Sequence, residues 1–137
     1  MTKLSERILP SGQKLTVLQA DITDVAVDSI VHPTSNSFYL GGEVGSAISR
    51  AGGTQIQRIT SDLHRTHGNL TRCNVAISDA SNSMLCKHII HVHSPSWNVS
   101  NQTQVIDELT LAVNNILTIS ETHKLKTVAL PSISSGG

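Results

Sequence analysis

Four short segments combine acidic, glycine or hydroxyl-bearing residues in a way that could bind a nucleotide. Asp21 ends the run KLTVLQAD, and a carboxylate there can accept a hydrogen bond from an exocyclic amine such as that of adenine. The segment LGGEVGSAI (40–48) pairs glycines, which allow close backbone approach, with a helix start whose free N–H groups favour an anion. HSPSW (93–97) and PSISSGG (131–137) add small residues that can surround phosphate oxygens with donors.

Each segment also has a simpler explanation. An acidic residue after a strand is commonly a solvated turn or a helix cap. The glycine segment lacks the G-x-G-x-x-G spacing of a Rossmann fingerprint and also suits a plain turn and cap. If the segments follow strands of one sheet they lie together, because ligands of open α/β sheets bind beyond the strands' carboxyl ends. The set therefore predicts a cleft for a nucleotide diphosphate that needs no cationic side chain.

The histidines do not combine into a metal site or a hydrolytic triad. Three lie within residues 88–93, but on a strand only His91 and His93 share a face. Two more fall in the helical segment 54–67, and no cysteine or carboxylate set completes four ligands. His32, at a strand end, is expected to be packed or hydrogen-bonded, since no Ser/His/Asp arrangement can be placed around it. We predict no metal, no cofactor and no catalytic residue.

Composition predicts a soluble globular protein and argues against several partners. The 137 residues are 38% hydrophobic and 15% charged, with a mean hydropathy of -0.03, as expected for one domain. Ten basic and ten acidic residues cancel, which argues against a surface that neutralises nucleic-acid phosphates. The only aromatic residues, Phe38, Tyr39 and Trp97, are too few for a base-stacking platform. No signal sequence and no run of about 20 apolar residues is present, which predicts an intracellular protein without membrane contact.

Strands and helices alternate along the chain. β-Branched, alternating or continuously apolar runs predict strands at residues 14–21, 28–34, 70–77, 87–94 and 126–133, of which 70–77 is the alternating one. Pro33 is expected to end the second strand, because proline cannot donate to a sheet ladder. This order predicts a layered α/β fold in one domain, residues 1–137. The stop at Gly137, after a strand and a glycine-bearing loop, predicts a fold that is incomplete at its C-terminus.

Three helices are expected between these strands. Glycine pairs at 41–42 and 52–53 bracket the first, and Thr54 N-caps a second that ends at His67 and Gly68. A long helix spans residues 102–123. Its predicted buried side comprises Val105, Ile106, Leu109, Val113, Ile116 and Leu117.

The ordered motifs resemble those of a macrodomain over nearly the whole chain. VLQADITDVAVDSIVHPTSNSFYLGGEVGSAISRAGG is similar to the first part of that family, and HIIHVHSPSW and VALPSISSGG to its later strands and loops. IVHPT, HSP-x-W and LPSI-S-x-G look closest to the macrodomain of the macro-histone variant. The resemblance implies a three-layer α/β/α fold with a mixed, mostly parallel central sheet and an ADP-ribose cleft at the strand ends.

Family resemblance also implies roles for individual residues. Asp21 should hold the adenine amine, with Ile22 beside it. The helix start should line the distal ribose and pyrophosphate with Gly42, Glu43, Val44, Gly45 and Ser46. Ser94 should contact phosphate or ribose. The loop that cradles the pyrophosphate should comprise Ser132, Ile133, Ser134, Ser135 and Gly136.

The chain departs from the macrodomains that hydrolyse ADP-ribose linkages. Those carry an N-A-A-N segment, then a glycine run and an acidic residue; the matching residues here are HPTS (32–35), with Gly45 at the acidic position. Glu43 is the nearby carboxylate, although glutamate at a helix start also has a structural role. Ser134 stands where many macrodomains have glycine, and its side chain can either crowd the pyrophosphate or donate to it.

The sequence is therefore compatible with three functions. The first is a non-enzymatic reader that brings its parent protein to ADP-ribose or ADP-ribosylated proteins. Resemblance to the macro-histone type adds a nuclear, chromatin-associated histone variant as that parent. The second is a mono-ADP-ribosyl or O-acetyl-ADP-ribose hydrolase that uses Glu43. The third is a structural or interaction domain that binds no nucleotide.

Overall fold

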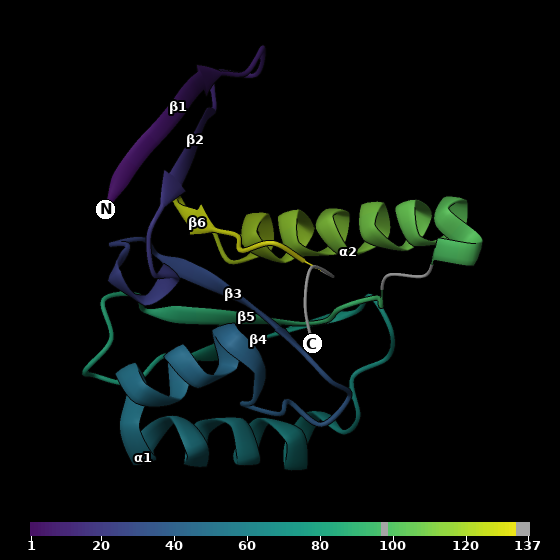
Figure 1. Ribbon diagram of the computed structural model, residues 1–137. Coiled ribbons are helices and arrows are strands. Elements are labelled where there is room, and N and C mark those ends of the chain that lie inside the picture. Colours follow the sequence, from purple (N-terminus) through teal and green to yellow (C-terminus); the bar gives the residue numbers. More distant parts are fainter. Residues whose placement is uncertain (97–98, 134–137) are drawn as a thin grey trace.

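The main sheet has four strands in the order β4-β5-β3-β6 (Figure 1). The computed structural model describes residues 1–96 and 99–133. β3 (Ser29–Thr34) is parallel to β5 (His88–His93) and to the two-residue β6 (Val128–Ala129), whereas β4 (Val75–Asp79) is antiparallel to β5. The predicted mixed, mostly parallel sheet is thus confirmed.

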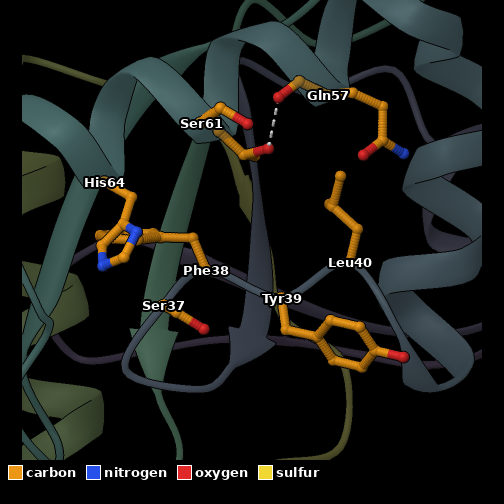
Figure 2. A pocket seen from close by; sticks show the side chains of 8 residues that line it. Ser37, Phe38, Tyr39, Leu40, Gln57, Ser61 and His64 are labelled. Carbon is orange, nitrogen blue, oxygen red and sulfur yellow. Dashed lines mark hydrogen bonds between the residues drawn. The ribbon is translucent and has the colours of Figure 1, made fainter.

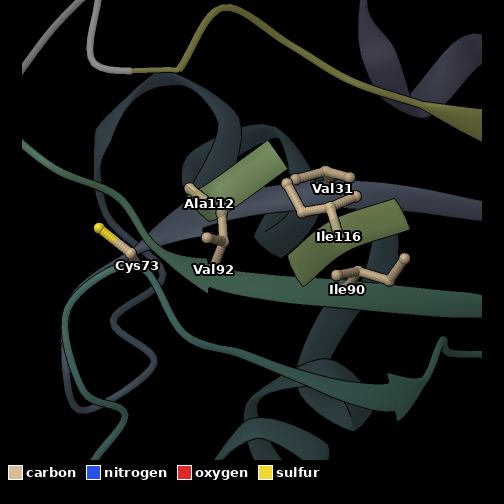
Figure 3. Close-up of a cluster of buried hydrophobic side chains, with 6 residues drawn as sticks. All are labelled: Val31, Cys73, Ile90, Val92, Ala112 and Ile116. Atoms are coloured by element: carbon tan, nitrogen blue, oxygen red, sulfur yellow. The ribbon is translucent and has the colours of Figure 1, made fainter. Parts of the chain in front are cut away.

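Helices cover both faces of this sheet and give three layers, as predicted (Figure 1). α1 (Gly42–His67) and the short 3₁₀ helix η1 (Ile22–Asp24) lie on one face, where Ile30 and Ile89 meet Ile48 and Ile56. α2 (Gln102–Thr122), preceded by η2 (Val99–Asn101), lies on the other. Figure 3 shows that second cluster, whose members are Val31, Cys73, Ile90, Val92, Ala112 and Ile116.

Because side chains alternate along a strand, neighbouring residues of β3 and β5 serve opposite layers. Ile30 and Ile89 face α1, while Val31 and Ile90 face α2, and all four are fully buried. A continuously apolar strand of this kind is typical of a sheet covered on both sides. The continuous apolar run from Lys87 is therefore explained by two-sided burial.

α1 consists of two helical segments joined by a sharp break. Gly53 adopts φ 64° and ψ −157°, outside the helical range, and the second segment folds back beneath the first (Figure 1). Only glycine adopts that conformation readily. The break falls one residue before the predicted cap Thr54, and the second segment ends at Gly68, which has φ 86°. The two predicted helices are therefore confirmed, with Gly53 as their junction.

An antiparallel hairpin precedes the sheet and projects away from it (Figure 1). β1 (Thr2–Ile8) pairs with β2 (Lys14–Gln19) in a sheet of its own, with Glu6 opposite Thr16. The strand predicted from Lys14 is confirmed, but β1 was not predicted, because TKLSERI lacks a clear alternation of apolar residues. All seven side chains of β1 are exposed.

Two predicted strands were wrong in extent. β4 begins at Val75 rather than at residue 70, because Asn74 N donates to Thr71 O in a turn (2.9 Å) and Cys73 takes φ 68°. β6 stops at Ala129 rather than at residue 133. Pro131 follows, and it cannot donate to a ladder.

β3 ends at Thr34, directly after Pro33, as predicted, although Pro33 itself still lies within the strand. β6 pairs only with Ser29 and Ile30 of β3. Beyond Ile30, one edge of β3 therefore has no ladder partner among the described residues, so a missing N–H is tolerated there.

The buried side of α2 is narrower than predicted. Val105, Ala112, Ile116 and Ser120 are buried, whereas Ile106 and Leu117 are 56% and 54% exposed. The helix carries apolar residues on more than one side, so apolar spacing alone did not distinguish the packed face. None of the helices within the described residues is long and apolar enough to cross a membrane.

Candidate functional site

Three loops meet at one edge of the sheet because the strands before them are parallel. Thr34, the last residue of β3, lies opposite His93, the last residue of β5, and β6 runs in the same direction. Ser94 N donates to Thr34 O at 3.4 Å and ties the first two loops together. The structure thus places Ser94, the glycine segment and the start of the last loop at the expected edge.

The start of α1 is shaped by two glycines. Gly42 has φ 74°, a left-handed conformation that other residues rarely adopt. Gly45 is buried, and a Cβ there would lie 2.7 Å from the carbonyl carbon of Leu40. Since the N-cap is Gly41, no capping side chain covers the first-turn N–H groups. These groups and the helix dipole suit an anion.

Glu43 and Val44 occupy the same turn with different surroundings. Glu43 is exposed. Val44 is partly buried against the cluster that includes Ile48 and Ile89. The first turn therefore presents one carboxylate to solvent and one apolar side chain to the sheet.

Asp21 is the N-cap of η1 and its carboxylate has a fixed orientation. Oδ1 accepts hydrogen bonds from the hydroxyl and the backbone N–H of Thr23, at 2.6 and 2.9 Å. These two bonds, in that order, hold the pKa of the Asp21 carboxyl below its usual value, with a smaller contribution from Arg50 in the same direction. Oδ2 has no hydrogen-bond partner in the described part of the chain, so it can accept from a ligand amine.

Ile22 brings η1 against α1. Its side chain is partly buried on the same cluster of Ile30, Ile48 and Ile89 that holds Val44. The structure therefore joins the predicted adenine end, at Asp21 and Ile22, to the predicted phosphate end, at the start of α1, through one apolar layer.

His32 is buried in that layer rather than open to solvent. Its Nδ1 lies 2.9 Å from Nδ1 of His91, and Nε2 of His91 lies 2.8 Å from the hydroxyl of Ser78. Ser78 in turn donates to Asp79 O, so the consistent tautomers have His32 donating to His91 and His91 donating to Ser78. The expectation of a packed, hydrogen-bonded His32 is confirmed.

Burial lowers the pKa of both imidazoles. Loss of solvation lowers the pKa of His32 to about 4, against a small opposing effect of the Tyr39 backbone. Loss of solvation also lowers the pKa of His91, to which the neighbouring His32 adds. Both rings are therefore neutral near pH 7.

Hydrogen bonds fix the loop between β3 and α1. The Thr34 hydroxyl donates to Tyr39 O at 2.8 Å, and the Ser35 and Ser37 hydroxyls are 3.2 Å apart. Phe38 has φ 63°, which is unusual for a bulky residue, yet it is only 2% exposed. Thr34 and Ser35 thus shape the loop through their side chains.

The last predicted loop is only partly described. Ser132 is exposed, and Ile133 is partly buried against the α2-side cluster. Ser134, Ser135 and Gly136 lie outside the described residues, as does Trp97 of the HSPSW turn. The roles expected for these positions stay predictions.

A separate pocket was missed by sequence reasoning. It encloses about 250 Å³ between the loop Ser37–Leu40 and one face of the second α1 segment, formed by Gln57, Thr60, Ser61 and His64 (Figure 2). The i, i+3, i+4, i+7 spacing of those helix residues was the available signal. It was overlooked because the residues are polar and the apolar positions Ile56, Ile59 and Leu63 defined the helix.

The remaining histidines are held by local contacts. His93 Nδ1 bonds the carbonyl of Leu70 at 2.9 Å, and His64 Nε2 bonds Asn69 Oδ1 at 2.7 Å. Within residues 1–96 and 99–133, no group of three or more potential ligand residues could hold a metal ion.

Comparisons with known proteins agree on one family. The family model described as "Macro domain" matches residues 31–137. Histone macroH2A1.1 of Capsaspora owczarzaki is 39% identical over 98% of this chain, which spans only 36% of that protein. O-acetyl-ADP-ribose deacetylase of Escherichia fergusonii is 32% identical over 90% of this chain and 68% of its own length.

A solved macrodomain has the same fold. A single-site mutant of the Oceanobacillus iheyensis macrodomain matches 99% of this chain and 72% of its own, with a TM-score of 0.84 and 26% identity. The structure of that macrodomain with ADP matches 98% of this chain and 70% of its own, with a TM-score of 0.74 and 25% identity. From its matching family model, its relatives and its three-layer fold, the chain belongs to the macrodomain family.

Proposed function

We propose that this macrodomain binds ADP-ribose, free or attached to proteins, and does not act on it. The orientation of Asp21 carries the proposal. Thr23 holds one carboxylate oxygen and keeps the group ionised, while Oδ2 is left to accept from the adenine amine. An amine donor that meets an ionised, oriented acceptor gains a strong hydrogen bond.

The phosphate end of the proposed cleft rests on the start of α1. Gly42 and Gly45 allow a close backbone approach, and uncapped N–H groups supply donors without a cationic side chain. Ser94 and the loop that begins at Ser132 would add hydroxyl and N–H donors from the neighbouring strand ends. The solved Oceanobacillus macrodomain with ADP supports a ligand of this chemistry.

Residues 32–35 favour binding without catalysis. In hydrolytic macrodomains the N-A-A-N segment is expected to position a water molecule. Here His32 is fully buried and bonded to His91, and the Thr34 hydroxyl is engaged by Tyr39 O. These groups support a scaffolding role rather than one at a reacting water.

Calorimetry with ADP-ribose tests the proposal. Wild-type chain should bind, and Asp21→Ala should weaken binding about 10- to 100-fold, the usual effect of losing a hydrogen bond to a charged group. Asp24→Ala is the matched control, because Asp24 is an exposed carboxylate in the same 3₁₀ helix. Absence of heat with a folded wild-type chain, or equal losses in both variants, contradicts the proposal.

A hydrolase is the second candidate, favoured by the deacetylase relative and by the exposed Glu43 at the helix start. Incubation with O-acetyl-ADP-ribose and with a mono-ADP-ribosylated protein distinguishes the two functions. A reader leaves both substrates intact. Turnover that Glu43→Gln abolishes would establish the enzyme, whereas turnover unchanged by that substitution would remove Glu43 from the mechanism.

The cellular setting is proposed from the macroH2A1.1 relative. We infer that residues 1–137 are a single macrodomain within a nuclear, chromatin-associated protein that it brings to ADP-ribosylated sites. Recruitment of the fluorescently labelled parent protein to such sites should be lost with Asp21→Ala. Recruitment that persists in a chain without nucleotide binding would instead favour a structural interaction domain.

A further inference from the structure

The pocket beside Phe38 is separate from the proposed ADP-ribose cleft. Its walls are the loop Ser37–Leu40 and the second α1 segment, and none of the positions proposed for ADP-ribose lines it. About 250 Å³ is below the roughly 300–1,000 Å³ of pockets for drug-sized ligands, so it suits a single ring.

No carboxylate, lysine or arginine lines this pocket, and its polar groups include both acceptors and hydroxyl donors. The Thr60 hydroxyl already donates to Ile56 O, and Gln57 Nε2 donates to Ser49 Oγ at 2.9 Å. These bonds leave the Thr60 hydroxyl oxygen and the Gln57 side-chain oxygen as acceptors, and the second Gln57 Nε2–H as a donor. Ser61 is exposed and its hydroxyl has no partner among residues 1–96 and 99–133, so it can both donate and accept.

His64 adds a further acceptor. Because its Nε2 lies 2.7 Å from the side-chain oxygen of Asn69, the neutral ring carries its proton on Nε2. Nδ1 then carries a lone pair and can accept a hydrogen bond. Figure 2 shows the His64 ring at one end of the pocket and Tyr39, a residue that is 69% exposed, at the other.

The pocket is formed before any ligand arrives. Phe38 holds a left-handed φ of 63° because its ring is buried with Leu70 and Ala76 and contacts His64 and His91 edge-on or tilted. A strained backbone persists only where packing fixes it. The wall that carries Ser37 and Tyr39 is thus rigid, and binding would not have to order it.

We propose that this pocket is a second binding site, for a neutral sugar or similar polyol of one ring. Hydroxyl groups of such a ligand donate to the Gln57, Thr60 and His64 acceptors and exchange hydrogen bonds with Ser61. Its apolar face packs on the exposed Tyr39 ring. Neither a lysine nor an arginine lines the pocket to balance the charge of a phosphate, so a neutral ligand is favoured over an anion.

Titration of the ¹⁵N-labelled chain with D-ribose, followed by amide chemical shifts, tests the proposal. Amides of Ser37–Leu40 and Gln57–His64 should shift and saturate with a Kd on the order of 1 mM, as expected for so small a ligand. Inorganic phosphate should leave these amides unmoved. Absence of saturable shifts with ribose, or equal shifts with phosphate, overturns the proposal.

Paired variants locate the site. Ser61→Gln places a larger polar side chain on the pocket wall and should weaken ribose binding at least about tenfold. Thr118→Gln makes a similar change on the exposed face of α2 and should leave it unchanged. Equal affinity in wild type and Ser61→Gln, with the remaining amide shifts intact, contradicts the assignment.

Saturating ADP-ribose separates this site from the cleft. Ribose shifts at Ser37–Leu40 and Gln57–His64 should persist when ADP-ribose already fills the proposed cleft. Their loss in the presence of ADP-ribose would show that the ribose shifts come from the cleft and would overturn a second site.

Discussion

His32 and His91 place two imidazole rings inside the α1 side of the sheet, both fully buried. Their Nδ1 atoms are 2.9 Å apart, which requires one donor and one acceptor. Protonation of His91 at Nδ1 would oppose two N–H groups, whereas protonation of His32 would add a proton at Nε2, a buried atom without a hydrogen-bond partner among the described residues. Either event would add an unpaired charge to the core. The contact between the two rings therefore fixes the tautomer of each and requires both to be uncharged.

This requirement predicts a pH-dependent stability. Histidine in the unfolded chain has a pKa near 6.5, whereas burial lowers the pKa of His32 to about 4 and also lowers that of His91. Below about pH 6.5 the unfolded chain binds protons that the folded chain does not. The free energy of unfolding therefore decreases as the pH is lowered. Each histidine contributes a slope of at most about 1.4 kcal/mol per pH unit, and for His32 the loss ends near pH 4.

Urea unfolding at a series of pH values above about 5 measures this slope with little interference from carboxyl groups. His32→Gln should remove the contribution of one buried imidazole and flatten the curve. His123→Gln, at the exposed end of α2, should leave the slope as in wild type. A wild-type free energy that is constant from neutral pH to about pH 5 contradicts the prediction.

At the scale of elements, the junction between the β3–α1 loop and α1 depends on Gly45. A Cβ at this position would lie 2.7 Å from the carbonyl carbon of Leu40 and 3.0 Å from its oxygen. Both are backbone atoms, so the helix or the loop must shift. From the sequence, Gly45 was predicted to line the ribose and pyrophosphate and to replace an acidic residue, whereas the structure adds a steric reason for glycine there.

Gly45→Ala should therefore destabilise the domain by about 1–3 kcal/mol, the usual range for overpacking. It should also weaken ADP-ribose binding, because the helix start moves. Urea unfolding and calorimetry measure the two effects, with Arg58→Ala, an exposed position in the second segment of α1, as control. Alanine exceeds glycine in helix propensity by about 1 kcal/mol. A Gly45→Ala variant that is more stable than wild type would therefore show that the fold accommodates a Cβ next to Leu40.

The elements that sequence predicted best were those bounded by glycine or filled by a buried apolar run. The Gly52–Gly53 pair marked the break in α1, and the run from Lys87 marked β5. Ends set by tertiary pairing were missed: β6 is short because only Ser29 and Ile30 pair with it. Turn conformations such as φ 68° at Cys73 leave no sign in residue type, so the start of β4 was also missed.

The candidate site, too, was predicted only in part from the sequence. Strand order and motif placed Ser94 and the α1 start correctly at one edge, because parallel strands dictate it. The Thr23 bonds that orient Asp21 and the His32–His91 contact depend on side-chain geometry, which spacing does not encode. The pocket beside Phe38 depends on a left-handed residue that is not glycine, which sequence patterns do not predict.

At the scale of the whole molecule, stability is unevenly distributed. The core strands β3 and β5 are buried between α1 and α2, with Ile30, Val31, Ile89 and Ile90 fully covered. The β1–β2 hairpin forms a sheet of its own, and Leu4, Ile8, Leu15, Val17 and Leu18 are all exposed. An isolated two-stranded hairpin is at best marginally stable in water.

Amide hydrogen exchange of the 137-residue chain should therefore be fast in residues 2–19 and slow in β3 and β5. Amides in the hairpin open locally, since little apolar surface is lost when its ladder breaks, whereas those of Ile89 and Ile90 open only with the whole core. Exchange followed by NMR or mass spectrometry measures both regions in one experiment, and β4, at the sheet edge but packed by α2, serves as an intermediate reference. Protection of the hairpin equal to that of β5 would mean that the hairpin is stabilised by contacts beyond its own ladder, and the prediction would be wrong.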